Sequence, residues 1–298
     1  MKLVFATSGE LYWKFLLENK VQNILHSFAY KDTFLRALQE HDVKNKFLMI
    51  DSGAFTAWTK KTAINLDEYI EFCKFLVKKY PENKWIPINL DVIPGEFGKI
   101  PTDSQIEYSA SKGWENYEYM LGKGIKPVHI FHQHEDFKWL HKLMKSSDYI
   151  GISPDNSQSV QSRVEWLKRV FSVVRDKVKT HGFACTGNAF VKSVPFYSAD
   201  SSSWIVGPRY GIVTYFDPKT ISIKMIHLSD IRTDRVEFNR FKSEVFPIIS
   251  KHIHVNMMDI VKAKESTKFL LKCAIIAQQQ LEIACTRLWE KRGIVFTT

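Results

Sequence analysis

The chain is poor in cysteine, and no motif pairs the cysteines it has. Cys73, Cys185, Cys273 and Cys285 are the only four, and no two of them form a CxxC or CxxxC motif. This spacing argues against a zinc ribbon and against a dense disulfide framework. We therefore expect reduced, semi-buried thiols.

Long apolar runs are also absent. The first residues, MKLVFATSGELYWKF, contain too short an apolar run for a signal peptide. The most apolar helical segment, FLLKCAIIAQQQLEIAC, is interrupted by Lys272, three glutamines and Glu282, whereas a membrane-spanning helix needs about 20 mainly apolar residues. We expect a soluble protein of the cytoplasm, or of the host cytoplasm if a phage encodes it, with no membrane partner.

Acidic residues are outnumbered by basic ones. The 298 residues carry a net charge of +10, and residues 206–298 hold 15 Lys and Arg against 9 Asp and Glu. A basic surface attracts polyanions by its long-range field. Charge alone leaves two interpretations open, a nucleic-acid partner and an ordinary solvated surface.

Short apolar runs alternate with segments of helical periodicity through the first two thirds of the chain. The eight apolar runs are residues 2–7, 23–30, 46–52, 85–91, 126–133, 149–154, 179–186 and 196–205. Most are almost continuously apolar, as expected for parallel strands buried on both faces. The alternation predicts a (β/α)8 TIM barrel over residues 1–205, with a doubly wound open sheet as the alternative.

The alternation ends after Ile205. The stretch YGIVTYFDPKTISIKMIHL predicts a β-hairpin that turns at DPKT. The segments DRVEFNRFKSEVFPIISKHI and 258–292 predict helices. Residues 206–298 are therefore expected to form a hairpin and helical extension packed on the barrel.

Polar residues stand at the ends of the predicted strands. Asp51 ends the third, Asp91 the fourth and His132-Gln133-His134 the fifth, while Asp200 lies in the eighth. Barrel enzymes carry their catalytic groups at the carboxyl ends of the strands, so these side chains are expected to converge. Turn-forming aspartates and ordinary packed or exposed histidines are the alternative interpretation.

Several carboxylates around one pocket suit glycosyl transfer. An ionised carboxylate can attack an anomeric carbon, and a second, protonated one can supply a proton to the leaving group. Gln133 offers both a donor and an acceptor to the edge of a nucleobase. The pair His132 and His134 with the aspartates leaves a metal-dependent hydrolase open as an alternative.

Five segments carry a resemblance to a known family. They are IDSGAF (50–55), NLDVIPG (89–95), HIFHQ (129–133), YIGISPD (149–155) and HGFACTGN followed by FYSADSSSW. In order and spacing they resemble the tRNA-guanine transglycosylase superfamily, most of all its shorter bacterial and phage members that insert 7-deazaguanine bases into DNA. The resemblance covers roughly residues 1–205 and implies a (β/α)8 barrel that exchanges guanine for a base of the preQ0 type.

The resemblance also implies roles for individual residues. Asp200 would be the nucleophile on the sugar C1′, and Asp51 would be the general acid/base, with a pKa raised by desolvation. Asp91, Gln133 and the Gly151 backbone would hold the base. Ser52, Gly53 and Phe55 would shape the pocket, Phe55 by stacking.

The surroundings of Asp200 carry two further expectations. Ser201, Ser202 and Ser203 are candidate hydrogen-bond donors to the Asp200 carboxylate. Trp204, which follows them in the sequence, is expected to pack against the barrel rather than to touch substrate.

The chain departs from the family in one respect that bears on its partner. Members that act on tRNA usually carry a Cys-x-Cys-x-x-Cys…His zinc site after the barrel, and Cys273 and Cys285 are too far apart to replace it. We therefore expect no cofactor, and DNA rather than tRNA as the substrate.

A base inside a duplex must be flipped out or presented in a single strand before an enzyme can act on it. Arg232, Arg235, Arg240 and Lys242 are the expected contacts to the nucleic-acid backbone. A tRNA-acting enzyme, a non-catalytic binding subunit, an oligomer and a partner protein all stay open.

Overall fold

Eight parallel strands form the centre of the structure. The computed structural model describes residues 1–96, 99–262 and 266–296. The strands are β1 (Lys2–Thr7), β2 (Asn23–Ser27), β3 (Phe47–Asp51), β4 (Lys84–Pro87), β5 (Ile130–His132), β6 (Tyr149–Ser153), β7 (Lys179–Gly182) and β8 (Ser198–Ser201). Their order in the sheet is β4-β3-β2-β1-β8-β7-β6-β5. Each strand except the edge strands β4 and β5 therefore lies between the strands that precede and follow it in the sequence, with β8 next to β1.

The two edge strands of this sheet meet and close it. Ile88 and Val128 form a parallel bridge, with Val128 N donating to Pro87 O at 2.8 Å and Asn89 N donating to Val128 O at 2.9 Å. Closure with a cyclic strand order is the (β/α)8 arrangement. The predicted barrel is confirmed, and the doubly wound sheet is excluded.

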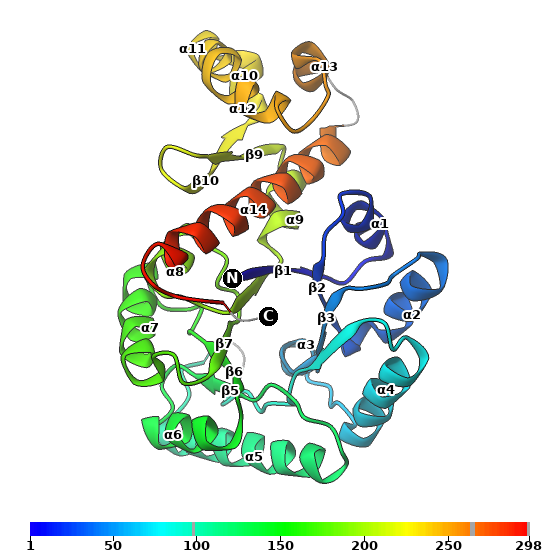
Figure 1. The fold of residues 1–298 in the computed structure, drawn as a ribbon, viewed down its shortest axis with the longest axis vertical. Helices are drawn as coiled ribbons and strands as arrows, with labels where there is room; N and C mark the ends of the chain where they lie inside the picture. The colour runs from blue at the N-terminus through cyan, green and yellow to red at the C-terminus, as the bar shows by residue number, and fades with distance from the viewer. Residues whose placement is uncertain (97–98, 263–265, 297–298) are drawn as a thin grey trace.

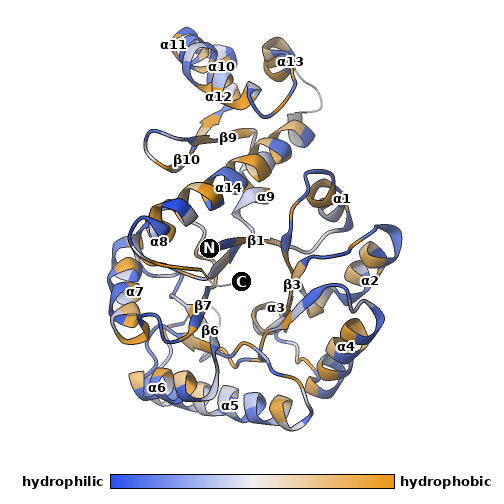
Figure 2. Ribbon diagram, viewed as in Figure 1, coloured by the Kyte–Doolittle hydropathy of each residue, from blue (hydrophilic) through white to orange (hydrophobic). Residues whose placement is uncertain are grey.

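Helices surround the strands, as Figure 1 shows. They are α1 (Glu10–Glu18), α2 (Lys31–Glu40), α3 (Ala54–Lys60), α4 (Leu66–Lys79), α5 (Asp103–Gly122), α6 (Phe137–Ser146), α7 (Val160–Val174) and α8 (Asn188–Ser193), with a short 3-10 turn η1 (Phe28–Tyr30). Local sequence sets their ends: Thr102 and Gln105 form a capping box at the start of α5, and the Asn65 side chain caps α4. Hydrophobic and hydrophilic residues alternate around these helices in Figure 2, as one buried face requires.

The barrel interior is filled by side chains at alternate strand positions. Its buried apolar cluster comprises Val4, Leu25, Phe47, Met49, Ile88 and Ile130. Because side chains alternate between the two faces of a strand, the residues two positions further along also face inward. This register turns Asp51, two residues after Met49, toward the carboxyl-end mouth of the barrel.

The eighth predicted strand is shorter than expected. Residues 196–205 were expected to form it, but β8 ends at Ser201 and helix α9 (Ser203–Arg209) begins two residues later. The side chain of Ser201 accepts a hydrogen bond from Ser203 N at 2.9 Å, which stabilises the turn into the helix. Helix α9 therefore spans the boundary expected after residue 205.

The C-terminal part holds the predicted hairpin and several helices. β9 (Ile212–Asp217) and β10 (Ser222–His227) pair antiparallel, as predicted. They are followed by α10 (Leu228–Thr233), α11 (Arg235–Arg240), the π-helix η2 (Phe241–Val245), α12 (Phe246–Ser250), α13 (Met257–Lys262) and α14 (Ser266–Glu290). Within the described residues, every helix is too short or too polar to span a membrane.

Helix α14 connects this part to the barrel. In Figure 1 it runs from the hairpin and its helices to the barrel wall. Leu270 packs in the core of the C-terminal part, whereas Leu281 packs in a barrel core. Glu282 Oε2 accepts a hydrogen bond from Leu3 N at 2.8 Å, and Trp289 Nε1 donates to Val191 O at 2.8 Å. The extension is thus packed on the barrel, as predicted.

Candidate active site

Three aspartates meet at the carboxyl ends of the strands. Asp51 ends β3, Asp200 lies in β8, and Asp91 follows β4. Burial removes the Asp51 carboxyl group from water and raises its pKa to about 6. The negative charges of Asp91 and Asp200 add to this rise, while hydrogen bonds from Ser27 and Gly53 oppose it. The three carboxylates are therefore electrostatic neighbours, and the raised pKa of Asp51 agrees with the sequence-based expectation.

The turn after Asp51 needs glycine. Gly53 has φ +87°, and a Cβ there would lie 3.0 Å from the Cβ of Ala29. Its N–H donates to Asp51 Oδ2 at 3.1 Å. Ser52 is fully buried, and its hydroxyl has no hydrogen-bond partner among the described residues. Gly53 thus holds one oxygen of the Asp51 carboxylate, whereas Ser52 lies beneath the turn.

An exposed aromatic ring follows this turn. Phe55 is 62% exposed, and its ring lies 5.9 Å from that of Trp58. Trp58 Nε1 donates to Gly95 O at 2.9 Å, which connects α3 to the loop after β4 that carries Asp91. Phe55 is accessible to stack on a planar ligand, the role the resemblance implies.

Asp200 is held by strand β7 and not by the serines that follow it. Its side chain is largely buried. His181 Nε2 lies 3.2 Å from Oδ1, and Ala184 N donates to the same oxygen at 3.2 Å. Ser201 instead bonds to Ser203 N, and no described serine bonds to the Asp200 carboxylate. The expected role of Ser201, Ser202 and Ser203 is therefore wrong, because β8 ends at Ser201 and the chain turns there into α9.

Trp204 behaves as predicted. It is buried, and its Nε1 donates to Ala6 O at 3.0 Å. Its indole also contacts the ring of Phe5 edge-on, with 5.6 Å between ring centroids. The tryptophan therefore fixes the start of α9 to β1 and does not face the carboxylates.

A chain of buried hydrogen bonds ends on Asp200. The Tyr149 hydroxyl lies 2.6 Å from Ser198 Oγ, and Ser198 Oγ lies 2.7 Å from His181 Nδ1. An ionised Asp200 can only accept, so His181 carries its proton on Nε2 and accepts the Ser198 hydroxyl proton at Nδ1. Burial raises the pKa of Tyr149 above its usual range, which keeps the phenol a donor to Ser198. All hydrogen bonds in the chain therefore point toward Asp200.

His181 was missed by the sequence analysis. It lies in the seventh predicted strand, in KTHGFACT, between two positions of the same inward face, Lys179 and Phe183. The sequence signal for His181 is a histidine at an inward-facing position of a predicted barrel strand, shortly before the polar carboxyl end of that strand. It is fully buried, and among the described residues its ring nitrogens contact Ser198 and Asp200.

Asp91 is also accompanied by a histidine. His132 Nε2 lies 3.0 Å from Asp91 Oδ2, although not in hydrogen-bond geometry. Burial lowers the pKa of His132, but Asp91 and Glu135 outweigh burial, so the pKa is raised. Glu135 Oε2 accepts from His132 N at 3.1 Å, and burial raises the pKa of Glu135 to about 7. The imidazole thus lies beside the Asp91 carboxylate, and the charge of Glu135 adds to the rise in its pKa.

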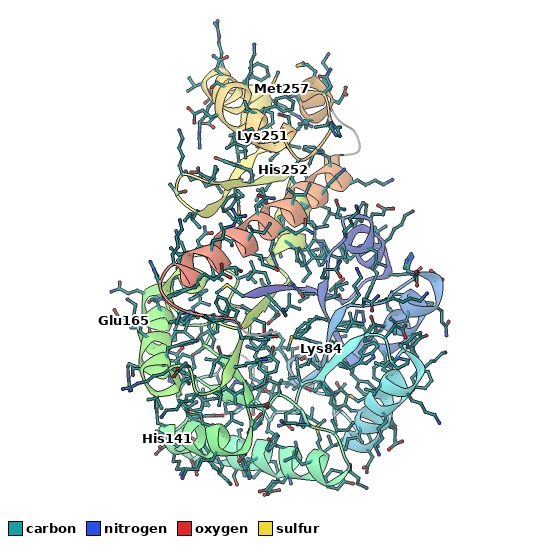
Figure 3. The ribbon with its side chains drawn as sticks, viewed as in Figure 1. Lys84, His141, Glu165, Lys251, His252 and Met257 are labelled. Carbon is teal, nitrogen blue, oxygen red and sulfur yellow. The ribbon has the colours of Figure 1, made fainter. Side chains whose placement is uncertain are left out.

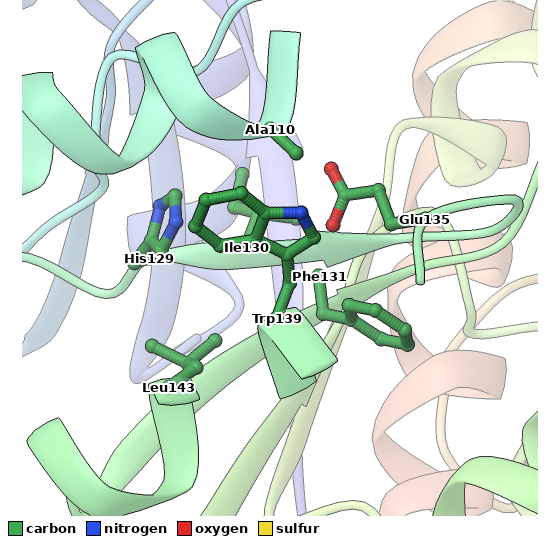
Figure 4. A pocket seen from close by; sticks show the side chains of 7 residues that line it. All are labelled: Ala110, His129, Ile130, Phe131, Glu135, Trp139 and Leu143. Carbon is green, nitrogen blue, oxygen red and sulfur yellow. The ribbon is translucent and has the colours of Figure 1, made fainter. Parts of the chain in front are cut away.

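Figure 4 shows the surroundings of Glu135. Its carboxyl group lies beside the Trp139 indole and above Phe131. The cavity that they line has a volume of about 10 Å³, which is room for roughly one water molecule. This region supports His132 and is too small for a substrate.

Two of the expected base-binding groups are already engaged. Gln133 Oε1 accepts from Asp155 N at 2.9 Å, which leaves its amide nitrogen for a ligand. Gly151 N donates to His129 O at 2.8 Å, and a Cβ at Gly151 would lie 2.7 Å from the Phe183 ring. Gly151 is therefore inside β6, and its N–H is used by the sheet and is not available to a base.

The two histidines of the metal hypothesis contact different carboxylates. His134 Nε2 lies 3.1 Å from Asp155 Oδ2, whereas His132 lies beside Asp91. Among residues 1–96, 99–262 and 266–296, no group of three or more His, Cys, Asp or Glu side chains is placed to hold a metal ion. The His-x-His pair of the alternative hydrolase interpretation is therefore not assembled as a ligand pair among the described residues.

The four expected backbone contacts lie away from the mouth. Arg232 is in α10, Arg235 and Arg240 are in α11, and Lys242 is in η2. All four are exposed, but Arg240 pairs with Glu237 at 3.1 Å. Figure 1 shows α10 and α11 at the end of the molecule farthest from the barrel. A nucleic acid held there would have to extend along the molecule to reach the aspartates.

Together these features define a class of molecule. It is a (β/α)8 barrel whose carboxyl-end mouth carries three aspartates, two of them accompanied by histidines, the fully buried His181 and the partly exposed His132. Comparison of the chain with protein-family models and with curated proteins gives no match. The function is therefore argued from the geometry of the mouth.

Proposed function

We propose that the protein is a DNA guanine transglycosylase, which exchanges a guanine in DNA for a 7-deazaguanine base through a covalent aspartyl-deoxyribose intermediate. The observation that carries the proposal is the asymmetric support of Asp200. His181 and Ala184 N–H both contact Oδ1, and no described residue bonds to Oδ2. One oxygen is thus held in place, and the other is left to act.

The reaction has two half-steps. In the first, Asp200 Oδ2 attacks C1′ of the deoxyribose, the bond from C1′ to guanine N9 breaks, and Asp51 supplies the proton that the departing guanine gains. In the second, ionised Asp51 accepts the N9 proton of the incoming base. N9 then forms the bond to C1′ and Asp200 is released as a carboxylate. Charge and protons balance over the cycle.

The pKa of Asp51 suits this exchange. A general acid/base works best when its pKa is close to the operating pH. Burial raises the pKa of Asp51 to about 6, so both of its protonation states are accessible near neutral pH. Asp200 has a different setting, because His181 and Ala184 N–H both contact its Oδ1 and hold that oxygen in place.

Recognition of the base would rest on three groups. Asp91, accompanied by His132, offers an acceptor to the N–H groups of a purine edge. The Gln133 amide nitrogen is a free donor, and Phe55 presents an exposed ring for stacking. These groups follow three different strands, β3, β4 and β5, at the mouth, as expected for a barrel enzyme.

The test is base exchange followed by trapping of the intermediate. The protein is incubated with a labelled 7-deazaguanine base and with DNA or tRNA, and label in nucleic acid is counted. A protein–DNA adduct should survive denaturation and be lost in Asp200→Asn. Asp217→Asn is the matched control, since Asp217 is equally buried at 8% exposure but lies in the hairpin, paired with Lys224.

Each alternative function has its own outcome in this experiment. Label in tRNA alone would move the substrate from DNA to tRNA. Tight DNA binding with neither label nor adduct would indicate a binding subunit. Stoichiometric metal in protein purified without added metal, lost on His132→Ala, would indicate the hydrolase.

A further inference from the structure

The barrel interior ends in lysines at the side opposite the aspartates. Lys2, Lys84 and Lys179 are the first residues of β1, β4 and β7. Each lies two positions before an inward-facing residue, so its side chain starts on the interior face. Figure 3 marks Lys84 within the ring of outer helices. The amino ends of parallel strands meet at one edge, so the three side chains converge there.

Shared aromatic rings show how close the three ammonium groups are. Lys2 Nζ lies 6.0 Å from the centroid of Phe47 and 5.4 Å from that of Tyr197. Lys84 Nζ lies 6.0 Å from the same Phe47 ring, and Lys179 Nζ lies 4.7 Å from the same Tyr197 ring. Lys2 therefore stands between the other two ammonium groups.

These positive charges are only partly balanced. In the described part of the chain, none of Lys2, Lys84 and Lys179 forms an ion pair, whereas the neighbouring Lys126 pairs with Asp148 at 2.8 Å. Asp148 also lies near enough to Lys179 to interact with its charge. Burial lowers the pKa of Lys2, Glu282 opposes this, and the charges of Lys84 and Lys179 lower it further. Converging like charges repel one another, and an anion between them would relieve that repulsion.

A cavity lies among these groups. Its volume is about 210 Å³, and its lining includes Lys84, Lys126, Lys179, Tyr149 and Tyr197 together with one carboxylate, Asp148, which pairs with Lys126. Lys2 lies beside this lining, against the Tyr197 ring. The volume is below the range of roughly 300–1,000 Å³ that is typical of drug-sized ligands. A small ion fits, and a complete nucleotide does not.

The wall also holds an unused polar group. The hydroxyl of Tyr197 is buried and has no hydrogen-bond partner among the described residues, although buried polar groups in proteins are normally paired. Tyr197 is 6% exposed and lines the cavity. A ligand oxygen in the cavity is the partner that the surrounding protein does not supply.

We propose that this cavity is a binding site for a small phosphate-type oxyanion, at the opposite end of the barrel from the aspartates. Several ammonium groups around one space suit a ligand with at least two negative charges and several acceptor oxygens. The ion is either free phosphate or diphosphate, or the terminal phosphate of a nucleotide whose remainder lies outside the cavity. The inference does not depend on the proposed transglycosylase activity.

The test measures binding of inorganic diphosphate to the full chain by calorimetry at constant ionic strength. We expect one equivalent to bind the wild type. The double variant Lys84→Gln, Lys179→Gln should raise Kd by about ten-fold or more, because two charge-assisted contacts are lost. The control double variant Lys145→Gln, Lys168→Gln removes two exposed lysines on α6 and α7. It has the same net charge and should keep the wild-type Kd.

Two results would overturn the site. Equal weakening in both double variants would show that only the general positive field attracts the anion. No binding to the wild type, with the same Tm in phosphate and in chloride of equal ionic strength, would show that the lysines only cover the aromatic rings. If the double variant fails to fold, the single variant Lys84→Gln provides a second test, because Lys84 is exposed and its replacement should leave the fold intact.

A second ligand separates the two sources of the anion. A nucleoside 5′-monophosphate that binds about ten-fold more tightly than inorganic phosphate would indicate a nucleotide, since the extra contacts come from outside the cavity. Equal affinity would indicate a free oxyanion. Both results support the site, provided that the Lys84 and Lys179 variants weaken the binding.

Discussion

His181 provides the sharpest prediction about the candidate active site. Its Nε2 lies 3.2 Å from Asp200 Oδ1, and its ring is fully buried. A hydrogen bond to a charged group contributes about 1.5–3 kcal/mol, and 1.36 kcal/mol in an activation barrier is a ten-fold change in rate. If the bond orients the nucleophile, His181→Ala should lower kcat/KM for base exchange by about 10- to 100-fold.

Rescue by a conservative variant distinguishes this role from a loss of packing. Removal of the imidazole takes a hydrogen-bond donor away from Asp200 Oδ1. His181→Gln keeps a side-chain N–H donor and should restore part of the rate. Single-turnover assays with labelled base would measure the rate of both variants.

His26 is the matched control for this variant. It is also fully buried in a barrel strand, and it bonds to Trp13 Nε1 at 3.1 Å and to Tyr30 O at 3.1 Å. His26→Ala should lower the stability of the fold but leave the exchange rate of the folded protein unchanged. The reasoning fails if His181→Ala leaves kcat/KM within about two-fold of wild type, or if both variants slow exchange equally.

Three further predictions concern the turn after β3. The pKa of Asp51 is raised from 3.8 to about 6, so its ionisation costs stability as pH rises from about 4 to 6. Asp51→Asn should therefore abolish exchange yet stabilise the fold by about 2–3 kcal/mol above pH 6, with no gain near pH 4, as thermal unfolding across this range would show. Gly53→Ala should cost about 2–4 kcal/mol in denaturant unfolding, because φ +87° is strained for alanine and the new Cβ meets Ala29. Gly124→Ala is the control, because Gly124 has a similar φ of +82° but no atom within 4 Å of a new Cβ. It should lose only the about 1–2 kcal/mol that the strained backbone costs, and an equal loss of stability in the two variants would contradict the steric argument. Phe55→Ala should raise KM for the base by about ten-fold or more through lost stacking. Since Phe55 is 62% exposed, the Tm of this variant should equal that of the wild type. An unchanged KM would show that Phe55 does not contact the base.

The barrel itself could be predicted from the sequence. Eight apolar runs alternate with helical segments, and parallel strands joined by helices bury both faces, so the strands must be apolar along their length. All parallel strands share one direction, so polar residues at their carboxyl ends necessarily gather at one edge. This is why Asp51, Asp91 and Asp200 could be placed together before the structure was known.

The partners of these aspartates were decided by the tertiary structure. Ser201 to Ser203 follow Asp200 in the chain, but β8 ends at Ser201 and turns into α9, so they leave the interior. His181 is 19 residues away in sequence and bonds to Asp200 because β7 and β8 pair in the register His181 to Ser198. That register depends on the closure of the whole barrel, which no local pattern contains.

The same reason explains the remaining differences. Gly151 looked available because it is a glycine near a strand end, yet β6 extends two residues further and Phe183 covers it. Composition predicted a basic C-terminal part, but only the path of α14 shows that α10 and α11 lie far from the mouth. Local sequence determined which residues form strands and where each strand becomes polar. Strand length, register and the packing of distant segments determined which of those polar groups touch one another, because such contacts form only when the sheet closes.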